Sequence, residues 1–184
     1  MFIRTQRLLL RPGWIEDAPA LASAIGDEAI LTKLAQVPSP YRVSDAEWFL
    51  SQPHSAENMP LLIFLRTQGT LRLIGATGLH DQGGALEIGY WLARDMWGLG
   101  FATEAGGAVI NMARHSLRLQ RLVSGHFIDN PASGRVLAKL GFRPTGQIVA
   151  RESRARGVSV PCVLYELDLL EDAPNGLMSP AMAA

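Results

Sequence analysis

Cysteine is nearly absent from this chain of 184 residues, and the single Cys162 excludes an intramolecular disulfide. The four histidines, His54, His80, His115 and His126, show no metal-ligand spacing, so we expect no bound metal. No charge of either sign is in excess, because 17 basic residues balance 17 acidic ones. The chain therefore has no broad electrostatic field for nucleic acid or an anionic membrane, and we expect no direct nucleic-acid partner.

Long apolar runs are also lacking. No segment is long enough to span a bilayer, and the N-terminus has neither the basic start nor the continuous apolar stretch of a signal peptide. We expect a cytoplasmic protein without a membrane partner. A composition that is 48% hydrophobic suits one domain, which we place at residues 1–170, with a loose, proline-bearing tail at 171–184. Cys162 lies in an apolar run and is interpreted as a buried structural thiol.

Strand and helix patterns alternate along the chain. Strands are expected at residues 2–11, 61–66, 71–79, 86–92, 121–127, 144–151 and 160–169. Helices are expected at 16–25, at 27–35, from a capping box of Ser44 and Glu47, from residue 102 to about 115, and from Asn130 to a stop at Gly141. Gln68 and Gly69 are read as a hairpin turn, residues 80–84 as a loop, and Trp48, Phe49 and Leu50 as core residues.

The most informative stretch joins the strand at 86–92 to the helix that begins near Ala102. Gly98 and Gly100 permit a sharp turn whose backbone N–H groups converge where the positive end of the helix lies. Such a loop is a potential anion-binding site. The hydroxyl of Thr103 is placed either to cap the helix or to bond a phosphate oxygen.

Three kinds of phosphate-binding loop compete for this stretch. The P-loop needs a Gly-Lys-Ser/Thr ending, which is absent, and the dinucleotide fingerprint needs a third glycine where Thr103 stands. The string from Trp97 to Ala102, W-G-L-G-F-A, resembles the pyrophosphate loop of the GNAT superfamily of acetyl-CoA-dependent N-acetyltransferases. Trp97 departs from the usual Gln or Arg of this loop. An aromatic residue at this position resembles the loop of the RimJ/RimL-like branch.

A second signature lies downstream, in D-N-P-A-S-G-R-V-L-A-K-L-G-F at residues 129–142. It resembles the GNAT segment in which an asparagine, here Asn130, opens a helix that ends in K-L-G-F. The opening T-Q-R-L-L-L-R-P also resembles RimJ/RimL-like chains. Two signatures in this order, with a strand between them, are far more specific than either alone.

This resemblance implies a mixed α/β fold, with one mostly antiparallel sheet of six to seven strands, splayed at the cofactor and flanked by about four helices. It implies acetyl transfer from acetyl-CoA directly to an amine, such as a protein or peptide α-amine. Two alternatives stay open: acetylation of a small amine such as a polyamine, antibiotic or metabolite, and a non-catalytic acyl-CoA sensor. The protein is expected to be a monomer or a homodimer.

The resemblance also implies roles for particular residues. The pyrophosphate is expected on Trp97, Gly98, Leu99, Gly100, Phe101, Ala102 and Thr103, the pantetheine arm on the backbone of Tyr90, Trp91 and Leu92, and another part of the cofactor on Asn130. Gly89 fits either a splay that admits the cofactor or relief of crowding beneath Trp91.

Glu87 is our candidate general base, directly or through a water, because it precedes the pantetheine contacts on the same strand. Its alternative is a purely structural glutamate. Many superfamily members carry an acidic tyrosine where Leu137 stands, so Ser133 is the candidate proton donor to the thiolate, although a CoA thiol is acidic enough to leave unaided. Glu104, His80, Asp81 and His126 are weaker candidates.

Overall fold

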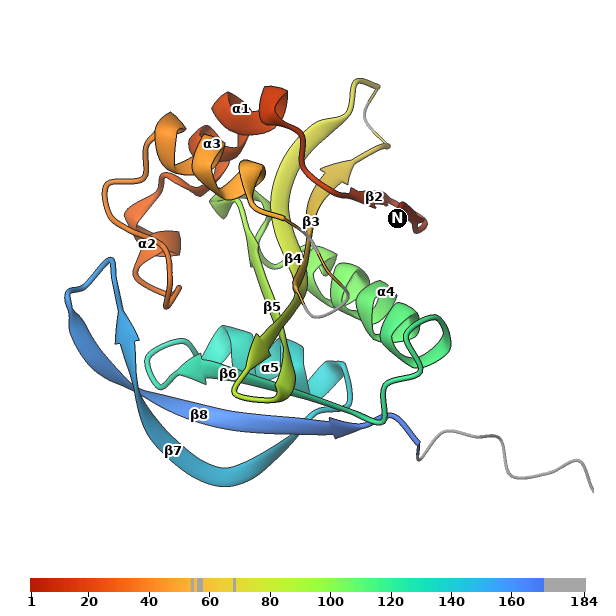
Figure 1. Ribbon diagram of the computed structural model, residues 1–184, viewed down its shortest axis with the longest axis vertical. Helices are drawn as coiled ribbons and strands as arrows, with labels where there is room; N and C mark the ends of the chain where they lie inside the picture. The colour runs from red at the N-terminus through yellow and green to blue at the C-terminus, as the bar shows by residue number, and fades with distance from the viewer. Residues whose placement is uncertain (54, 56–57, 68, 171–184) are drawn as a thin grey trace, which may run out of the picture.

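The computed structural model describes residues 1–53, 55, 58–67 and 69–170. The predicted tail at 171–184 and Gln68 of the predicted hairpin turn lie outside the described residues. A single eight-stranded sheet with helices on both faces forms the structure (Figure 1). The mixed, mostly antiparallel sheet predicted from the sequence is confirmed.

The sheet has the strand order β1-β2-β3-β4-β5-β6-β8-β7. The strands are β1 (Ile3–Arg4), β2 (Leu8–Arg11), β3 (Asn58–Leu65), β4 (Arg72–Gln82), β5 (Ala85–Leu92), β6 (Arg121–Phe127), β7 (Arg143–Ser153) and β8 (Val158–Asp168). Every neighbouring pair is antiparallel except β5 and β6, which are parallel. The long hairpin of β7 and β8 curves strongly at the lower edge of Figure 1.

Helices cover the two faces of the sheet. They are α1 (Ala18–Ile25), α2 (Glu28–Leu31), α3 (Val43–Ser51), α4 (Phe101–His115) and α5 (Pro131–Lys139), with short 3-10 turns η1 (Ile15–Asp17) and η2 (Arg94–Met96). One face packs on α4 and α5, and the other on α1 and α3. Side chains of a strand alternate between faces, so Ile88 and Leu92 join the α4 core whereas Trp91 packs beside α1.

Several element boundaries differ from the sequence prediction. The predicted strand at 2–11 is two strands, because the Thr5 hydroxyl accepts the Leu8 N–H and the Thr5 N–H donates to the Leu8 carbonyl, which closes a turn between them. Strand β4 continues to Gln82, so the predicted loop at 80–84 is only a tight turn at Gly83 and Gly84, both with positive φ. The sheet therefore has eight strands rather than six to seven.

The helices also differ in detail. The predicted capping box of Ser44 and Glu47 is wrong, because α3 begins at Val43 and the Asp45 carboxylate accepts the N–H of Arg42. The predicted helix at 27–35 is only the single turn α2. Leu50 is buried as predicted, but Trp48 is 64% exposed. With Ala46 and Leu50 one turn apart on the core face, Trp48 points outward.

Two glycines lie opposite each other in the register of β4 and β5. A Cβ on Gly78 would stand 2.4 Å from the Met59 carbonyl oxygen and 2.8 Å from Pro60 Cα, which are backbone atoms. A Cβ on Gly89 would meet only the His80 ring, at 3.5 Å. Crowding therefore explains Gly78 but does not explain Gly89.

We expect Gly78→Ala to lower the free energy of unfolding by about 2 kcal/mol, because backbone of β3 must move to admit the methyl group. Gly89→Ala is the matched control, and we expect it to raise that free energy by up to about 0.5 kcal/mol, since alanine loses less entropy in a strand. Urea unfolding followed by circular dichroism measures both. Equal effects of the two variants would contradict this assignment.

Candidate active site

The centre of the site is the opening where β5 and β6 separate. All residues of both strands are described, and they share a single registered pair, Glu87 with Val123. The Ser124 hydroxyl then donates to the Ile88 carbonyl at 2.9 Å. Backbone groups alternate between the two edges of a strand, so the N–H and C=O of Tyr90 also point toward this side, beyond the last contact with β6. We call this gap the β5–β6 opening.

The glycine loop follows directly after β5 and η2. Gly98 and Gly100 have φ angles of 75° and 82°, and α4 begins immediately after Gly100. No side chain caps α4, so Thr103 is not the cap and the first N–H groups of the helix have no acceptor among the described residues. The indole N–H of Trp97 donates to the Leu92 carbonyl at 2.8 Å, which ties the loop to the end of β5. The loop and the β5–β6 opening thus form one continuous surface.

The predicted loop residues differ in how they face solvent. Trp97 and Leu99 are about half exposed, whereas the side chain of Phe101 is buried in the α4 core. Phe101 is therefore available to a ligand through its backbone alone.

Arg7, from the turn between β1 and β2, clamps the glycine loop. Its Nε donates to Glu104 at 2.7 Å, its backbone N–H donates to the same carboxylate at 2.9 Å, and its Nη1 donates to the Leu99 carbonyl at 3.0 Å. The guanidinium also lies 4.2 Å from the centre of the Phe101 ring. Thr5 adds a 2.6 Å hydrogen bond to Glu104. We call these residues the Arg7 clamp.

The clamp changes the interpretation of Glu104. Burial alone would raise the pKa of this carboxyl, but the hydrogen bonds from Thr5 and Arg7 and the charge of Arg7 together lower it. Glu104 is therefore an ionised structural anchor, and not simply an acidic residue near a helix dipole. Sequence reasoning missed Arg7, because a contact across 97 residues leaves no local pattern.

Glu87 lies at the floor of the opening and is 5% exposed. Its two carboxylate oxygens accept hydrogen bonds from Nη1 and Nη2 of Arg151 on β7, at 2.7 and 2.9 Å. These bonds raise the pKa of the Arg151 guanidinium, although burial alone would lower it. His80, its partner across β4 and β5, has Nε2 4.0 Å from Oε1 of Glu87. A catalytic role for Glu87 stays a prediction.

The predicted proton donor lies on the other face of β5. The Tyr90 hydroxyl is 2.8 Å from the Ser133 hydroxyl and donates to the Ser133 carbonyl at 3.1 Å. Burial raises the pKa of Tyr90 to about 12, so this phenol stays protonated at neutral pH. Asn130 caps α5 by accepting the Ser133 N–H, at 3.4 Å. Leu137 is fully buried in the core.

Two weaker candidates are engaged elsewhere. His126 contacts the Phe127 carbonyl through Nδ1, at 2.8 Å, and the Tyr165 hydroxyl through Nε2, at 3.4 Å. Asp81 accepts the Gly84 N–H in the turn between β4 and β5. Cys162 is buried, as predicted, and burial raises the pKa of its thiol.

A group of cations borders the opening on the Glu87 face. The turn between β7 and β8 docks on the segment after α2, where Arg154 donates to the Gln36 carbonyl and Arg156 to the Thr32 carbonyl. Lys33 and Arg156 both pair with the carboxylate of Asp129, at 3.1 and 2.9 Å, and the pKa of Asp129 is lowered, mainly by the hydrogen bond from Arg156. Ala155 packs in the same cluster as Trp91, which places this turn beside β5. We call Lys33, Arg154, Arg156 and Asp129 the basic rim.

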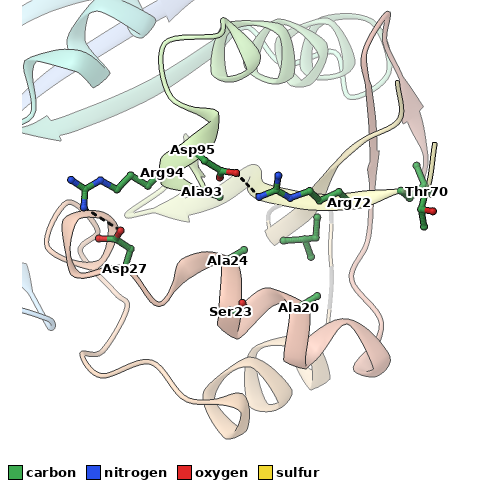
Figure 2. A pocket seen from close by; sticks show the side chains of 11 residues that line it. Ala20, Ser23, Ala24, Asp27, Thr70, Arg72, Ala93, Arg94 and Asp95 are labelled. Atoms are coloured by element: carbon green, nitrogen blue, oxygen red, sulfur yellow. Dashed lines mark hydrogen bonds and ion pairs between the residues drawn. The ribbon is translucent and has the colours of Figure 1, made fainter. Parts of the chain in front are cut away.

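A separate hollow of about 630 Å³ lies between α1, the start of β4 and the segment after β5 (Figure 2). Its charges pair with one another, Arg72 with Asp95 at 2.5 Å and Arg94 with Asp27 at 3.4 Å. None of the predicted site residues lines it. The predicted residues instead gather at the opening and the glycine loop.

Among the described residues, no group of three or more His, Cys, Asp or Glu side chains is arranged to hold a metal ion. The helices of this part of the chain are also too short or too polar to cross a membrane.

Comparison with known proteins identifies the family. A family model described as an acetyltransferase (GNAT) domain matches residues 7–143. An uncharacterized N-acetyltransferase, p20 from Bacillus licheniformis, is 30% identical over 168 residues, which cover 89% of this chain and 93% of p20.

Two solved structures share the fold. RimL, a ribosomal L7/L12 α-N-protein acetyltransferase in complex with coenzyme A, superposes with a TM-score of 0.75 at 18% identity, over 91% of this chain and 98% of RimL. Spermidine N-acetyltransferase from Vibrio cholerae, in complex with CoA and spermine, superposes with a TM-score of 0.74 at 17% identity, over 90% of this chain and 98% of that enzyme. The open edge of β5 and the uncapped helix after the glycine loop fit the extended arm and the pyrophosphate of acetyl-CoA. The chain belongs to the GNAT family and is an acetyl-CoA-dependent N-acetyltransferase.

Proposed function

We propose that the chain transfers the acetyl group of acetyl-CoA to the α-amine of a peptide or protein. The observation that carries this proposal is the charge around the Glu87 face of the opening. Glu87 is neutralised by Arg151, and the basic rim has three cations for one carboxylate. A polyamine would meet repulsion there, whereas a peptide N-terminus presents one amine together with carbonyl or carboxylate oxygens.

The intrinsic basicity of the acceptor supports the same choice. An α-amine has a pKa of about 7.7 to 8.0, against about 10.4 for a lysine side chain, so it needs far less help to lose its proton at neutral pH. Because a solved spermidine acetyltransferase and a protein α-amine acetyltransferase both share this fold, the fold does not select the acceptor. The charge around the opening and the lower basicity of an α-amine both favour an α-amine acceptor.

The cofactor roles that we propose follow the geometry of the opening. The pyrophosphate binds the backbone N–H groups from Gly98 to Thr103, which the Arg7 clamp holds in place. The pantetheine arm lies along β5 beside Tyr90, Trp91 and Leu92, and it pairs with the backbone of Tyr90. Asn130 uses its side-chain oxygen to cap α5, which leaves its amide nitrogen for the cofactor.

Ser133 is the proposed proton donor to the CoA thiolate. Its hydroxyl contacts the Tyr90 hydroxyl, and Tyr90 in turn contacts the Ser133 carbonyl. Tyr90 therefore holds the serine hydroxyl in place and itself stays protonated. Leu137, at the position where relatives carry a tyrosine, offers no proton.

The acceptor proposal is tested by release of free thiol from acetyl-CoA in the presence of different amines. We expect peptides with free N-termini to stimulate release at least tenfold above background, with acidic peptides better than basic ones. Spermidine and aminoglycosides should give little stimulation, because the basic rim repels them. Stronger stimulation by spermidine would overturn the proposed acceptor class, and tight acetyl-CoA binding without any stimulation would favour the sensor alternative.

The Arg7 clamp predicts that Glu104→Gln weakens acetyl-CoA binding by roughly tenfold, since the glycine loop loses its anchor.

Because the folded pKa of Glu104 is lowered, the carboxylate stabilises the fold above the unfolded pKa of about 4.3, and this contribution disappears as the pH falls through the folded pKa. The stability difference between wild type and variant should therefore shrink below about pH 4. Calorimetric titration and thermal unfolding measure the two effects. Arg72→Ala, which breaks the exposed pair with Asp95, is the control and should leave acetyl-CoA affinity unchanged.

The proton-donor assignment predicts that Ser133→Ala slows turnover by roughly tenfold to a hundredfold and leaves acetyl-CoA affinity within about twofold. The variant keeps the N–H that Asn130 caps, so α5 should stay intact. Tyr90→Phe keeps the serine hydroxyl and should be the milder change. If Ser133→Ala turns over at the wild-type rate, the thiolate leaves without a protein donor.

A further inference from the structure

We propose that His80 accepts the proton of the attacking amine, and that Glu87 positions His80 and closes the floor of the opening. The inference rests on the proposed function only in placing the reacting amine at the β5–β6 opening. It assigns the base to β4, the strand next to the one on which the sequence placed it.

The first reason is that both oxygens of Glu87 are already engaged. Arg151 donates one hydrogen bond to each of them, at 2.7 and 2.9 Å, in a bidentate pair, and the Arg151 side chain is only 20% exposed. A guanidinium stays protonated in proteins. A proton added to Glu87 would therefore break the pair and leave a buried cation without its counter-charge.

The second reason is the placement of His80. Its register partner across β4 and β5 is Glu87, and its side chain is 42% exposed. The Cε1 atom of the ring stands 3.5 Å from the point where a Cβ of Gly89 would lie. A glycine at this position leaves the ring lying over bare backbone, beside the edge of β5 on which the thioester is proposed to bind.

The third reason is the chemistry of imidazole. Imidazole is the side chain most often used to take up and release a proton in catalysis near neutral pH, so it is chemically suited to accept the proton of an amine. Glu87 on β5, its partner Arg151 on β7 and the adjacent Asp81 are charged groups near His80, and the basic rim lies on the same side of the sheet. Glu87 and Arg151 neutralise each other, and Asp81 is bound in the turn at Gly84. Asn58, its partner on β3, is neutral.

The step balances without an oxidant or reductant. The amine nitrogen attacks the thioester carbonyl carbon, a C–N bond forms, the C–S bond breaks and the sulfur leaves with the electron pair as thiolate. The surplus proton of the amine goes to Nδ1 of His80, which lies 3.8 Å from the Cβ position of Gly89, and then to solvent, while Nε2 faces Glu87. The thiolate receives a proton from Ser133 or from water.

The test is the pH dependence of kcat/KM for thiol release, measured with the most active amine of the panel. We expect His80→Gln to lower kcat about a hundredfold, to leave acetyl-CoA affinity within twofold, and to remove the rising limb on the acid side of the pH profile. Added imidazole should restore part of the rate. Glu87→Gln should keep that limb but lower the midpoint of thermal unfolding, and His115→Gln, at the exposed end of α4, should match wild type.

Three results would overturn the proposal: persistence of the rising limb in His80→Gln, its loss in Glu87→Gln, or an NMR signal of the His80 ring that acetyl-CoA leaves unchanged. The proposed acceptor fails separately. If a polyamine is the most active amine, the acceptor class is wrong, yet the same pH profiles measured with that amine still decide the role of His80.

Discussion

The separation of β5 from β6 is the constraint on which the rest of the structure depends. If β5 and β6 stayed paired along their length, the backbone N–H and C=O of Tyr90 would hydrogen-bond to β6 and would not be available to a ligand. Because pairing stops after Glu87 and Val123, the edge is open, and the strands must be held apart by contacts elsewhere. The Ser124 hydroxyl donates to the carbonyl of Ile88 at the start of the opening, and the Trp97 indole N–H donates to the carbonyl of Leu92 at the end of β5.

The curved hairpin of β7 and β8 supplies the other half of this support. Although β7 is the outermost strand, its curvature returns Arg151 to Glu87 on β5, across the intervening β6 and β8 (Figure 1). A second attachment joins Arg154 and Arg156 to the segment after α2. Removal of either partner of a buried ion pair costs far more than the pair itself contributes. The Glu87–Arg151 pair therefore fixes the position of the hairpin over the opening.

Local pattern was sufficient for most of the fold. The strand at residues 121–127 and the helix that ends near His115 agree with β6 and α4, because each carries an uninterrupted apolar period and a clear stop. The sequence prediction failed where a side chain decides the backbone. Thr5 breaks one expected strand in two, and Asp45 starts α3 in place of the expected Ser44. These boundaries depend on single hydrogen bonds, which the hydrophobic periodicity of the sequence does not reveal.

The site was predictable in outline for a different reason. The glycine loop and Asn130 carry their geometry in their residue types, so a motif locates them. The partners that set their behaviour lie far away in the chain: Arg7 is 97 residues from Glu104, and Arg151 is 64 residues from Glu87. The sequence therefore indicated Glu87 as a candidate general base on this strand, but it did not show that the carboxylate is already paired.

The alternation of β5 gives the two proposed proton transfers separate places. Glu87 and Trp91 face the side of the sheet on which His80, Arg151 and the basic rim lie, whereas Ile88 and Tyr90 face α4 and α5, where Ser133 lies. In our proposal the amine enters on the first side and the thiolate is protonated on the second. The base and the donor then lie on opposite faces of the sheet. Gly89 lies on the first side, where a Cβ would approach only the His80 ring, at 3.5 Å, so relief of crowding does not explain the glycine.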